Sequence, residues 1–288
     1  MPNQQPVLHG VHHTARPTWK LRDTIEFYRD KLGLPMVHAI SARGWGPSNH
    51  ADFLHFFFGS GQGSTIAFFY YIGADQPDFA KPHDDYRYEA THTAWQVHSQ
   101  EELLAWRARL EAQGIPIMFQ IRHELIESIY FRDPNGYYLE ITFEVRDMTP
   151  LDADDATLTM ESAMAMEDAE RAGRGRFRSI DQVWNEKARR LKAAHATETV
   201  KDHSASMFVL DVPEFETYVQ ACQAAPSCEV TGPVDGYWHI ESSDPIVFER
   251  KPLGLTPALW NAALTGGFLG KVTTFDRHRL EITPEAQP

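Results

Sequence analysis

The sequence predicts an α+β protein built from repeated βαβββ units, and three observations indicate this fold. A strand, a helix and three strands are predicted over residues 7–72. The same pattern returns over residues 91–145, roughly 80 residues later. The composition, 42% hydrophobic and 23% charged, is typical of a globular protein. Two such units can pair their curved sheets around a shared cavity, so we expect a cupped mixed sheet.

The first unit opens with a strand predicted over residues 7–16, which should end before Pro17. Apolar residues then recur at helical spacing from Leu21 to Leu32, and Gly33 is placed as a helix C-cap. Three strands are expected at residues 36–42, 52–58 and 65–72, the last two joined by the glycine-rich turn GSGQG.

The second unit repeats this order, beginning with a strand at residues 91–97. Ser99 with Glu102 forms a capping-box pattern, and the helix that follows should end at Gly114. Strands are expected at residues 115–121, 127–131 and 137–145, the last two joined by the tight turn DPNG. Because side chains alternate along a strand, Glu140 in the last strand faces either solvent or a cavity.

The remaining sequence predicts a different organisation. We expect domains at residues 1–148, 149–200 and 201–288, the second being helical, with Lys187 at the edge of an apolar helix stripe. The third shows the βαβββ order again, but Ser204 falls where His92 stands and Glu249 falls near Glu140. We therefore expect a degenerate third module, followed beyond Leu255 by a further helix.

Charge and composition exclude some classes of function. A formal net charge of -13 argues against nucleic-acid or anionic-membrane binding as the main role, since both need a basic surface. Two cysteines are too few for a disulfide framework, and the start of the sequence lacks the apolar core of a secretory signal. No run approaches the roughly 18 apolar residues that span a bilayer. These features predict a cytoplasmic metabolic protein.

Three residues are candidate metal ligands: His13 and His92 on the first strands of the two units, and Glu140 on the last strand of the second. Two histidines and a carboxylate leave open positions on an octahedral ion, the arrangement used by non-heme Fe(II) oxygenases. Manganese, zinc or nickel could occupy similar ligands. His12 is the alternative to His13, since neighbours face opposite ways in a regular strand.

The paired units, the opening HHTARPTWKLRDTIEFYRDKLGL, the restart THTAWQV and the closing YFRDPNGYYLE together resemble the vicinal oxygen chelate superfamily. This superfamily includes glyoxalases, fosfomycin-resistance proteins and extradiol dioxygenases, and the resemblance covers about residues 7–147. It implies metal ligands at His13, His92 and Glu140, which match the superfamily's ligand positions in turn. Its modules also exchange between chains, so the resemblance implies a homo-oligomer.

The reaction class is indicated by further residues. Glyoxalases of the superfamily carry another acidic or amide ligand on the last strand of the first unit, where STIAFFYYI has no acid. Tyr130 stands ten residues before Glu140, where extradiol dioxygenases hold a tyrosine that hydrogen-bonds the bound catecholate. His123 precedes it as a histidine does in those enzymes, although the spacing is two residues shorter. His55 is a second candidate for acid–base work.

We therefore expect an Fe(II)-dependent ring-cleaving dioxygenase, with Mn(II) or another divalent first-row metal possible, acting on a catechol-like substrate with dioxygen. The alternatives are a metal-dependent lyase, isomerase or transferase on a small chelating substrate, and a metal-free drug-binding resistance protein. Several aromatic residues of the first unit could form a wall of the substrate site: Trp45, Phe56, Phe58, Phe68 and Tyr70.

Overall fold

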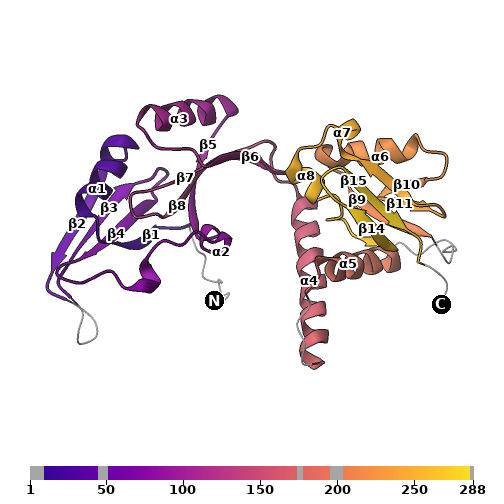
Figure 1. Cartoon of the computed structure of the whole chain (residues 1–288), viewed down its shortest axis with the longest axis horizontal. Helices are drawn as coiled ribbons and strands as arrows, with labels where there is room; N and C mark the ends of the chain where they lie inside the picture. The colour runs from indigo at the N-terminus through magenta and orange to yellow at the C-terminus, as the bar shows by residue number, and fades with distance from the viewer. Residues whose placement is uncertain (1–9, 45–50, 174–177, 195–203, 286–288) are drawn as a thin grey trace, which may run out of the picture. The chain divides into compact units, whose positions relative to one another are not determined.

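The structure is a computed structural model of the chain, and it describes residues 10–44, 51–173, 178–194 and 204–285. The chain divides into two compact units (Figure 1). The first comprises Met1–Ile121 and Ile126–Glu144, and the second comprises Arg122–Leu125 and Val145–Pro288. Within the described ranges, no helix is both long enough and apolar enough to cross a membrane.

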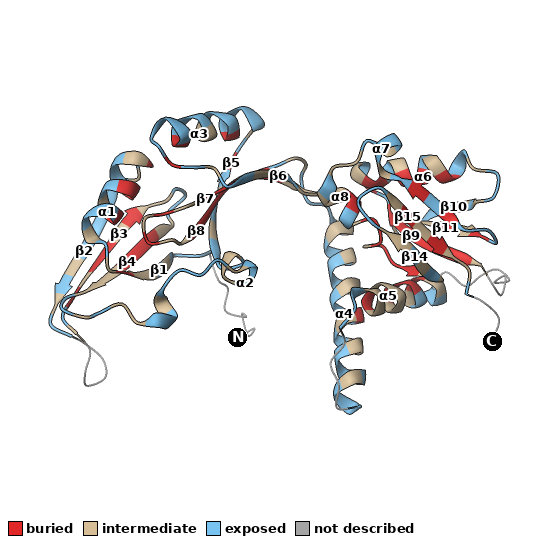
Figure 2. Cartoon of the chain, viewed as in Figure 1, coloured by how far each residue is buried: buried red, intermediate tan, exposed pale blue. Residues whose placement is uncertain are grey.

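The first unit begins with the predicted βαβββ module. Its elements are β1 (His13–Thr18), α1 (Leu21–Ile25) extended by a π-helical turn (Glu26–Lys31), β2 (Met36–Ala42), β3 (Phe53–Gly59) and β4 (Thr65–Tyr71). The sheet order is β1-β4-β3-β2, with β1 parallel to β4. Buried residues concentrate on β3 and β4 (Figure 2), where Phe58 and Phe68 pack against Tyr28 of the π-helical turn. The predicted order of this module is confirmed.

One strand boundary in this module was predicted wrongly. β1 runs through Pro17 to Thr18, with Pro17 opposite Phe69 of β4, instead of ending before the proline. Proline lacks a backbone N–H, and β1 is the edge strand of its sheet, so the missing donor leaves no ladder bond unmade. Residues 7–9 of the predicted strand lie outside the described residues.

The second module has the same topology. It consists of β5 (His92–Val97), α3 (Gln100–Ala112), β6 (Phe119–Arg122), β7 (Ile126–Arg132) and β8 (Tyr138–Glu144), in the order β5-β8-β7-β6. The Ser99 hydroxyl accepts the Glu102 N–H at 3.2 Å, as the capping pattern predicts. Between the modules lie two short helices, η2 (Asp78–Ala80) and α2 (Tyr86–Glu89).

The DPNG turn joins β7 to β8 and also holds the two modules together. Asp133 accepts the backbone N–H groups of Asn135 and Tyr137 at 2.8 and 2.9 Å, and it receives the Tyr28 hydroxyl of the first module at 3.1 Å. Asn135 bonds Thr18 and Thr24, both buried. The sequence predicts the turn alone. Its role as a buried contact between modules is visible only in the structure.

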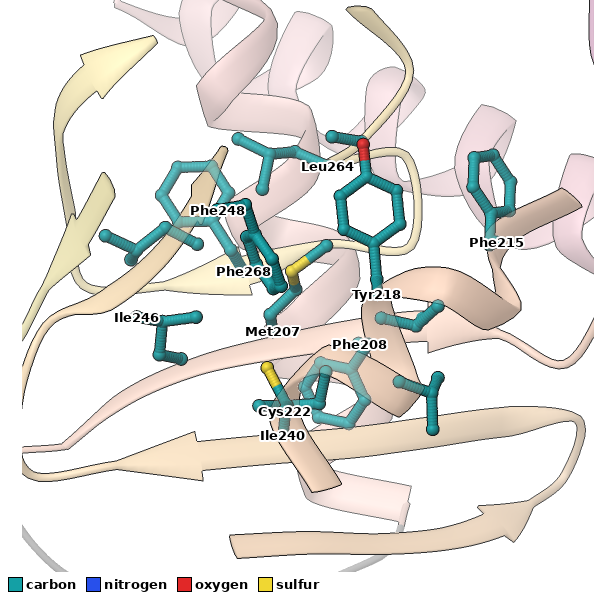
Figure 3. Close-up of a cluster of buried hydrophobic side chains, with 14 of the residues drawn as sticks. Met207, Phe208, Phe215, Tyr218, Cys222, Ile240, Ile246, Phe248, Leu264 and Phe268 are labelled. Atoms are coloured by element: carbon teal, nitrogen blue, oxygen red, sulfur yellow. The ribbon is translucent and has the colours of Figure 1, made fainter. Parts of the chain in front are cut away.

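The second unit contains two helices, α4 (Pro150–Ala172) and α5 (Ile180–Ala194), followed by an α+β region. That region consists of β9 (Ala205–Leu210), η3 (Pro213–Phe215), α6 (Glu216–Gln223), β10 (Glu229–Val234), β11 (Tyr237–Ser242), β12 (Ile246–Glu249), α7 (Arg250–Leu253), α8 (Pro257–Asn261), β13 (Phe268–Leu269), β14 (Lys271–Phe275) and β15 (Arg279–Thr283). Figure 3 shows its core, in which Met207, Tyr218 and Phe248 are buried together.

This region keeps the strand–helix–three-strand order but not the strand pairing of the first two modules. β9 lies between β11 and β13 and is antiparallel to both, whereas β12 pairs with β15 in a separate sheet. The glycines before β13 explain the difference, since a Cβ at Gly266 would collide with the Phe208 carbonyl, and the Phe208 N–H bonds Gly267 at 2.8 Å. The prediction of a third module is therefore corrected to a different topology. The tail supplies α8, as predicted, and also strands.

Candidate metal centre

Three side chains of the second module converge at the centre of its sheet. Tyr130 on β7 stands directly opposite Glu140 on β8, and its hydroxyl donates to Glu140 Oε1 at 3.0 Å. His92, the first residue of the parallel neighbour β5, places Nε2 2.9 Å from Glu140 Oε2. The carboxylate therefore holds one neighbour on each oxygen. Two of the three predicted ligands and the predicted tyrosine form one connected group.

Burial differs across this group. The Glu140 side chain is 4% exposed, so it does not face solvent, whereas the His92 side chain is 33% exposed. Burial, and then the charge of Glu140, raise the pKa of Tyr130 to about 12, so its hydroxyl remains a proton donor at neutral pH. The carboxylate is therefore buried and the imidazole beside it is accessible. A cation held between them would be open to solvent or substrate on the His92 side.

The second ring nitrogen of His92 sets its orientation. Nδ1 lies 3.0 Å from the backbone carbonyl of Glu89, which can only accept, so Nδ1 donates this hydrogen bond. The short helix α2 that supplies this carbonyl is capped by Asp85, and the Glu89 side chain accepts from Arg132 of β7 at 3.3 Å. These contacts direct Nε2 toward Glu140, as outer hydrogen bonds do for histidines that bind metals.

Tyr138 completes the polar face of this site. It precedes Glu140 by two residues on β8, stacks on Tyr130 with ring centroids 5.5 Å apart, and lies 6.3 Å from the His92 ring. The residue is 2% exposed, and its hydroxyl has no hydrogen-bond partner among the described residues. Burial and the nearby Glu89 raise its pKa to about 12. Strand alternation places Tyr138 on the face of Glu140, but the sequence does not single it out as functional.

His13 does not join this group within one chain. It pairs with Thr65 in the β1–β4 ladder, and its ring contacts Phe57 at 5.8 Å and His12, with the two Nδ1 atoms 2.9 Å apart. His12 precedes β1, so strand alternation does not separate the two rings. In the parts of the chain that the structure describes, no three His, Cys, Asp or Glu side chains are placed to hold a metal ion.

The other two predicted catalytic histidines lie elsewhere. His55 is 6% exposed on β3, donates from Nδ1 to the Phe68 carbonyl at 3.0 Å and stacks on Phe69 at 3.6 Å. Burial lowers its pKa, and His13 and His38 lower it further, so the imidazole is held neutral. His123 lies in the segment Arg122–Leu125, which groups with the second unit. The catalytic roles of both histidines stay predictions.

The predicted aromatic wall includes residues from the wrong face of the sheet. Phe58 and Phe68 pack against Tyr28, on the side covered by the first helix. The face that carries His13 presents Phe57 and Phe69 instead, as the strand registers require. An apolar cavity of about 470 Å³ opens near this face, and Trp45 lies outside the described residues. The cavity lining includes Ala15, Trp19, Phe69, Tyr71 and Phe79.

The donor atoms fit a metal in part. His92 Nε2 and Glu140 Oε2 lie within contact of each other, where one cation could bind both, and imidazole and carboxylate together suit first-row divalent ions. A third protein ligand is missing from this set, because His13 lies on the other module. Among the described residues, the second module therefore offers two candidate ligands for a metal ion, His92 and Glu140.

The family comparison agrees with this description. Residues 10–141 match the model of the Glyoxalase/Bleomycin resistance protein/Dioxygenase superfamily. The matched residues include His13, His92, Tyr130 and Glu140. The predicted resemblance to this superfamily is therefore confirmed for residues 10–141. A comparison with curated protein sequences finds no match.

Several solved structures align with about half of the chain. Lactoylglutathione lyase from Agrobacterium tumefaciens is 21% identical over 48% of this chain and 95% of its own, with a TM-score of 0.35. A glyoxalase/dioxygenase from Nostoc punctiforme is 19% identical over 49% and 99%, with a TM-score of 0.36. A glyoxalase/bleomycin resistance protein/dioxygenase from Nocardioides is 19% identical over 51% and 91%, with a TM-score of 0.35.

Proposed function

We propose that the first unit is an Fe(II)-dependent dioxygenase that cleaves the ring of a catechol-like substrate, with Mn(II) as the other candidate metal. The observation that carries this proposal is the connected group His92–Glu140–Tyr130, in which an accessible imidazole and a buried carboxylate share one small space. On β4, the residues that share a sheet face with His13 are Thr65, Ala67 and Phe69. None of them is the further acidic ligand that glyoxalases carry on this strand. This favours open metal positions for two substrate oxygens and dioxygen.

The residues of the site have separate tasks in this proposal. His92 and Glu140 would hold the metal, which when bound supplies a template for the two vicinal oxygens and a route for electrons to dioxygen. The Glu89 carbonyl accepts a hydrogen bond from Nδ1 of His92 and so directs Nε2 toward Glu140, where it would bind the metal. Tyr130 holds Oε1 of the carboxylate and thereby orients Oε2 toward His92. Tyr130 thus acts as a positioning residue in this state.

A second copy of the chain would complete the ligand set. His13 is exposed on β1, and its neighbour Ala15 on the same face is exposed too, as are Ala94 and Gln96 beside His92. We therefore propose a homo-oligomer in which His13 of one copy meets His92 and Glu140 of another. Large apolar side chains that are also exposed on this unit would be covered by such an assembly: Val11, Met36, Val37, Met118 and Phe119.

The apolar cavity near the His13 face favours a second candidate function. Its lining contains aromatic rings but neither His92 nor Glu140, so it could bind an apolar molecule without any metal. A metal-free resistance protein would use this cavity alone. A metal-dependent lyase, isomerase or transferase would use the metal centre without dioxygen. These alternatives differ from ring cleavage in their need for metal and for oxygen.

The test begins with anaerobic purification and measurement of bound metal before and after addition of Fe(II). We expect about one iron per site, and oxygen consumption when the loaded protein receives one of a panel of catechols and hydroquinones. Protein that takes up no first-row metal would favour the metal-free candidate. Metal uptake with no oxygen consumption across a broad panel would contradict ring cleavage and leave the lyase, isomerase and transferase reactions.

The oligomeric part of the proposal is tested by mixing two inactive variants. Equimolar His13→Ala and Glu140→Gln proteins, mixed under conditions that allow subunit exchange, can form hybrid assemblies in which one shared site has all its native ligands. We expect recovery of part of the wild-type metal binding and activity in the mixture. Absence of recovery despite exchange shown by native mass spectrometry would contradict a site shared between copies.

A further inference from the structure

Two tyrosines of the metal centre have different hydrogen-bond states although they stack on each other. The Tyr130 hydroxyl donates to Glu140 Oε1 at 3.0 Å and is therefore already engaged. The Tyr138 hydroxyl, buried beside it, has no partner among the described residues. Arg132 lies over its ring, with Cζ 5.7 Å from the centroid, and the Glu89 side chain accepts a hydrogen bond from Arg132. The donor of Tyr138 is free for another molecule.

An unpartnered buried hydroxyl is unfavourable for the protein alone. Burying a hydroxyl without a partner costs about 1–3 kcal/mol relative to a paired one, and a phenylalanine would fill the same space without that cost. A buried polar group without a partner therefore calls for an explanation, and a ligand that supplies the missing partner is one. Tyr138 lies on the face of Glu140, with its ring 6.3 Å from the His92 ring, so such a ligand would enter beside the metal ligands.

We propose that Tyr138 is a substrate-binding residue whose hydroxyl donates a hydrogen bond to an oxygen of the substrate. This inference rests on the proposed function, and it assigns to Tyr138 the contact that the family resemblance implies for Tyr130. The geometry distinguishes the two residues: Tyr130 fixes the carboxylate, and Tyr138 is the hydroxyl left to meet a phenolic oxygen. It follows that substrates with an oxygen in reach of Tyr138 are preferred over those lacking one.

The experiment compares Tyr138→Phe with two matched tyrosine-to-phenylalanine variants. Tyr130→Phe removes a hydroxyl that is engaged with Glu140. Tyr218→Phe removes a buried hydroxyl of the second unit that also lacks a partner among the described residues, in a setting where burial alone raises its pKa. Each variant is examined for melting temperature without metal, for metal content, and for anaerobic binding of 4-nitrocatechol to the Fe(II)-loaded protein.

We expect Tyr138→Phe to keep its metal content, to melt at or above the wild-type temperature, and to bind 4-nitrocatechol about tenfold more weakly, the effect of one lost hydrogen bond. Tyr218→Phe should show the same thermal behaviour with unchanged binding of the probe. Tyr130→Phe should melt lower and lose metal affinity. Loss of a purely structural hydroxyl would not weaken probe binding while leaving stability unimpaired, so this combination in Tyr138→Phe would indicate a contact with the substrate.

Two outcomes would overturn the inference. One is unchanged probe binding in Tyr138→Phe while the wild-type protein binds it. The other is a fall in melting temperature as large as that of Tyr130→Phe, which would show that the hydroxyl has a structural partner. Failure of the proposed function is a separate result, because the wild-type protein would then take up no metal or bind no 4-nitrocatechol.

Discussion

Two buried polar groups, one in each unit, differ in how completely their hydrogen bonds are made. Lys187 of α5 is fully buried, and its three N–H donors meet Asp155 Oδ1 at 2.5 Å, Thr159 Oγ1 at 2.9 Å and the Thr265 carbonyl at 2.8 Å. The metal centre has a half-exposed imidazole and a tyrosine without a partner. A satisfied network stabilises a fold, whereas open donors and acceptors are available to a ligand.

The comparison also shows what burial does to a charge. Burial lowers the pKa of Lys187, but the adjacent Asp155 carboxylate raises it and so offsets part of that effect. Asp155 Oδ1 also accepts a hydrogen bond from the Tyr237 hydroxyl at 2.6 Å. Hydrogen bonds from the protein thus replace water around the buried pair. Among the described residues, Glu140 of the candidate metal centre pairs with no lysine or arginine. It has an imidazole, a group that both protons and metals can bind.

The largest effect is expected from removing the carboxylate charge of the metal centre. Glu140→Gln should weaken metal binding on the order of 1000-fold, about 4 kcal/mol, while the fold is retained. Titration of the apoprotein with Fe(II) or Zn(II) measures this. Glu127→Gln is the matched control, since Glu127 is also a buried glutamate of the same sheet but is held by Gln100 and Gln120. An equal loss of metal affinity in both variants would show that the change disturbs folding and does not remove a ligand.

The next largest effect should appear in the second unit. Lys187→Met leaves Asp155 without its cation, and the free energy of unfolding of this unit should fall by about 3 kcal/mol. Chemical denaturation, followed by the fluorescence of Trp184 or Trp260, reports on this unit. Metal binding by the first unit should not change. The double variant Lys187→Met/Asp155→Leu should recover part of the loss, and no recovery would mean that the pair is not the cause.

Tyr130→Phe should have an intermediate effect. It removes a hydrogen bond to a charged carboxylate, so we expect about 1.5 kcal/mol of lost stability and a 10–100-fold decrease in metal affinity. Thermal unfolding and metal titration measure the two parts. A variant with normal metal affinity would show that Tyr130 does not orient Glu140.

The smallest effect is expected from the outer support of His92. Arg132→Gln removes the ion pair between Arg132 and Glu89, whose two side chains are 22% and 31% exposed. Because partly exposed ion pairs contribute little, the free energy of unfolding should change by less than about 1 kcal/mol. Metal affinity should decrease only a few-fold, because α2 keeps its Asp85 cap. Arg22→Gln, in a more exposed pair, should change neither quantity. A large loss of metal in Arg132→Gln would indicate a direct role for the arginine.

Several features were predictable because they depend on neighbouring residues. The strand–helix–three-strand order of the two modules follows from apolar spacing, the Ser99 cap and the DPNG turn, whereas the short helices η2 and α2 lie in a segment predicted as a loop. The opposition of Tyr130 and Glu140 follows from the length of that turn. The predicted candidates Tyr130 and Glu140 meet for this reason, since strand pairing converts their fixed spacing into proximity. Their role in metal binding still awaits measurement.

Other predictions failed where distant segments decide the outcome. Lys187 was placed at the edge of an apolar stripe but is fully buried, because Asp155 on α4 and Thr265 near β13 meet its ammonium group. The predicted third module has its own pairing, because the glycines around 266 let β13 approach β9. No pattern within α5 or β9 itself carries this information.

By itself, the sequence determined the two βαβββ modules, the resemblance of residues 10–141 to the superfamily and the spacing that brings Tyr130 and Glu140 face to face. Only the tertiary structure decided that His92 reaches Glu140 while His13 remains on the other module, and that Tyr138 is buried with a free hydroxyl. The physical reason is range: periodicity and turns act over a few residues, whereas burial and convergence depend on packing between strands far apart in the chain.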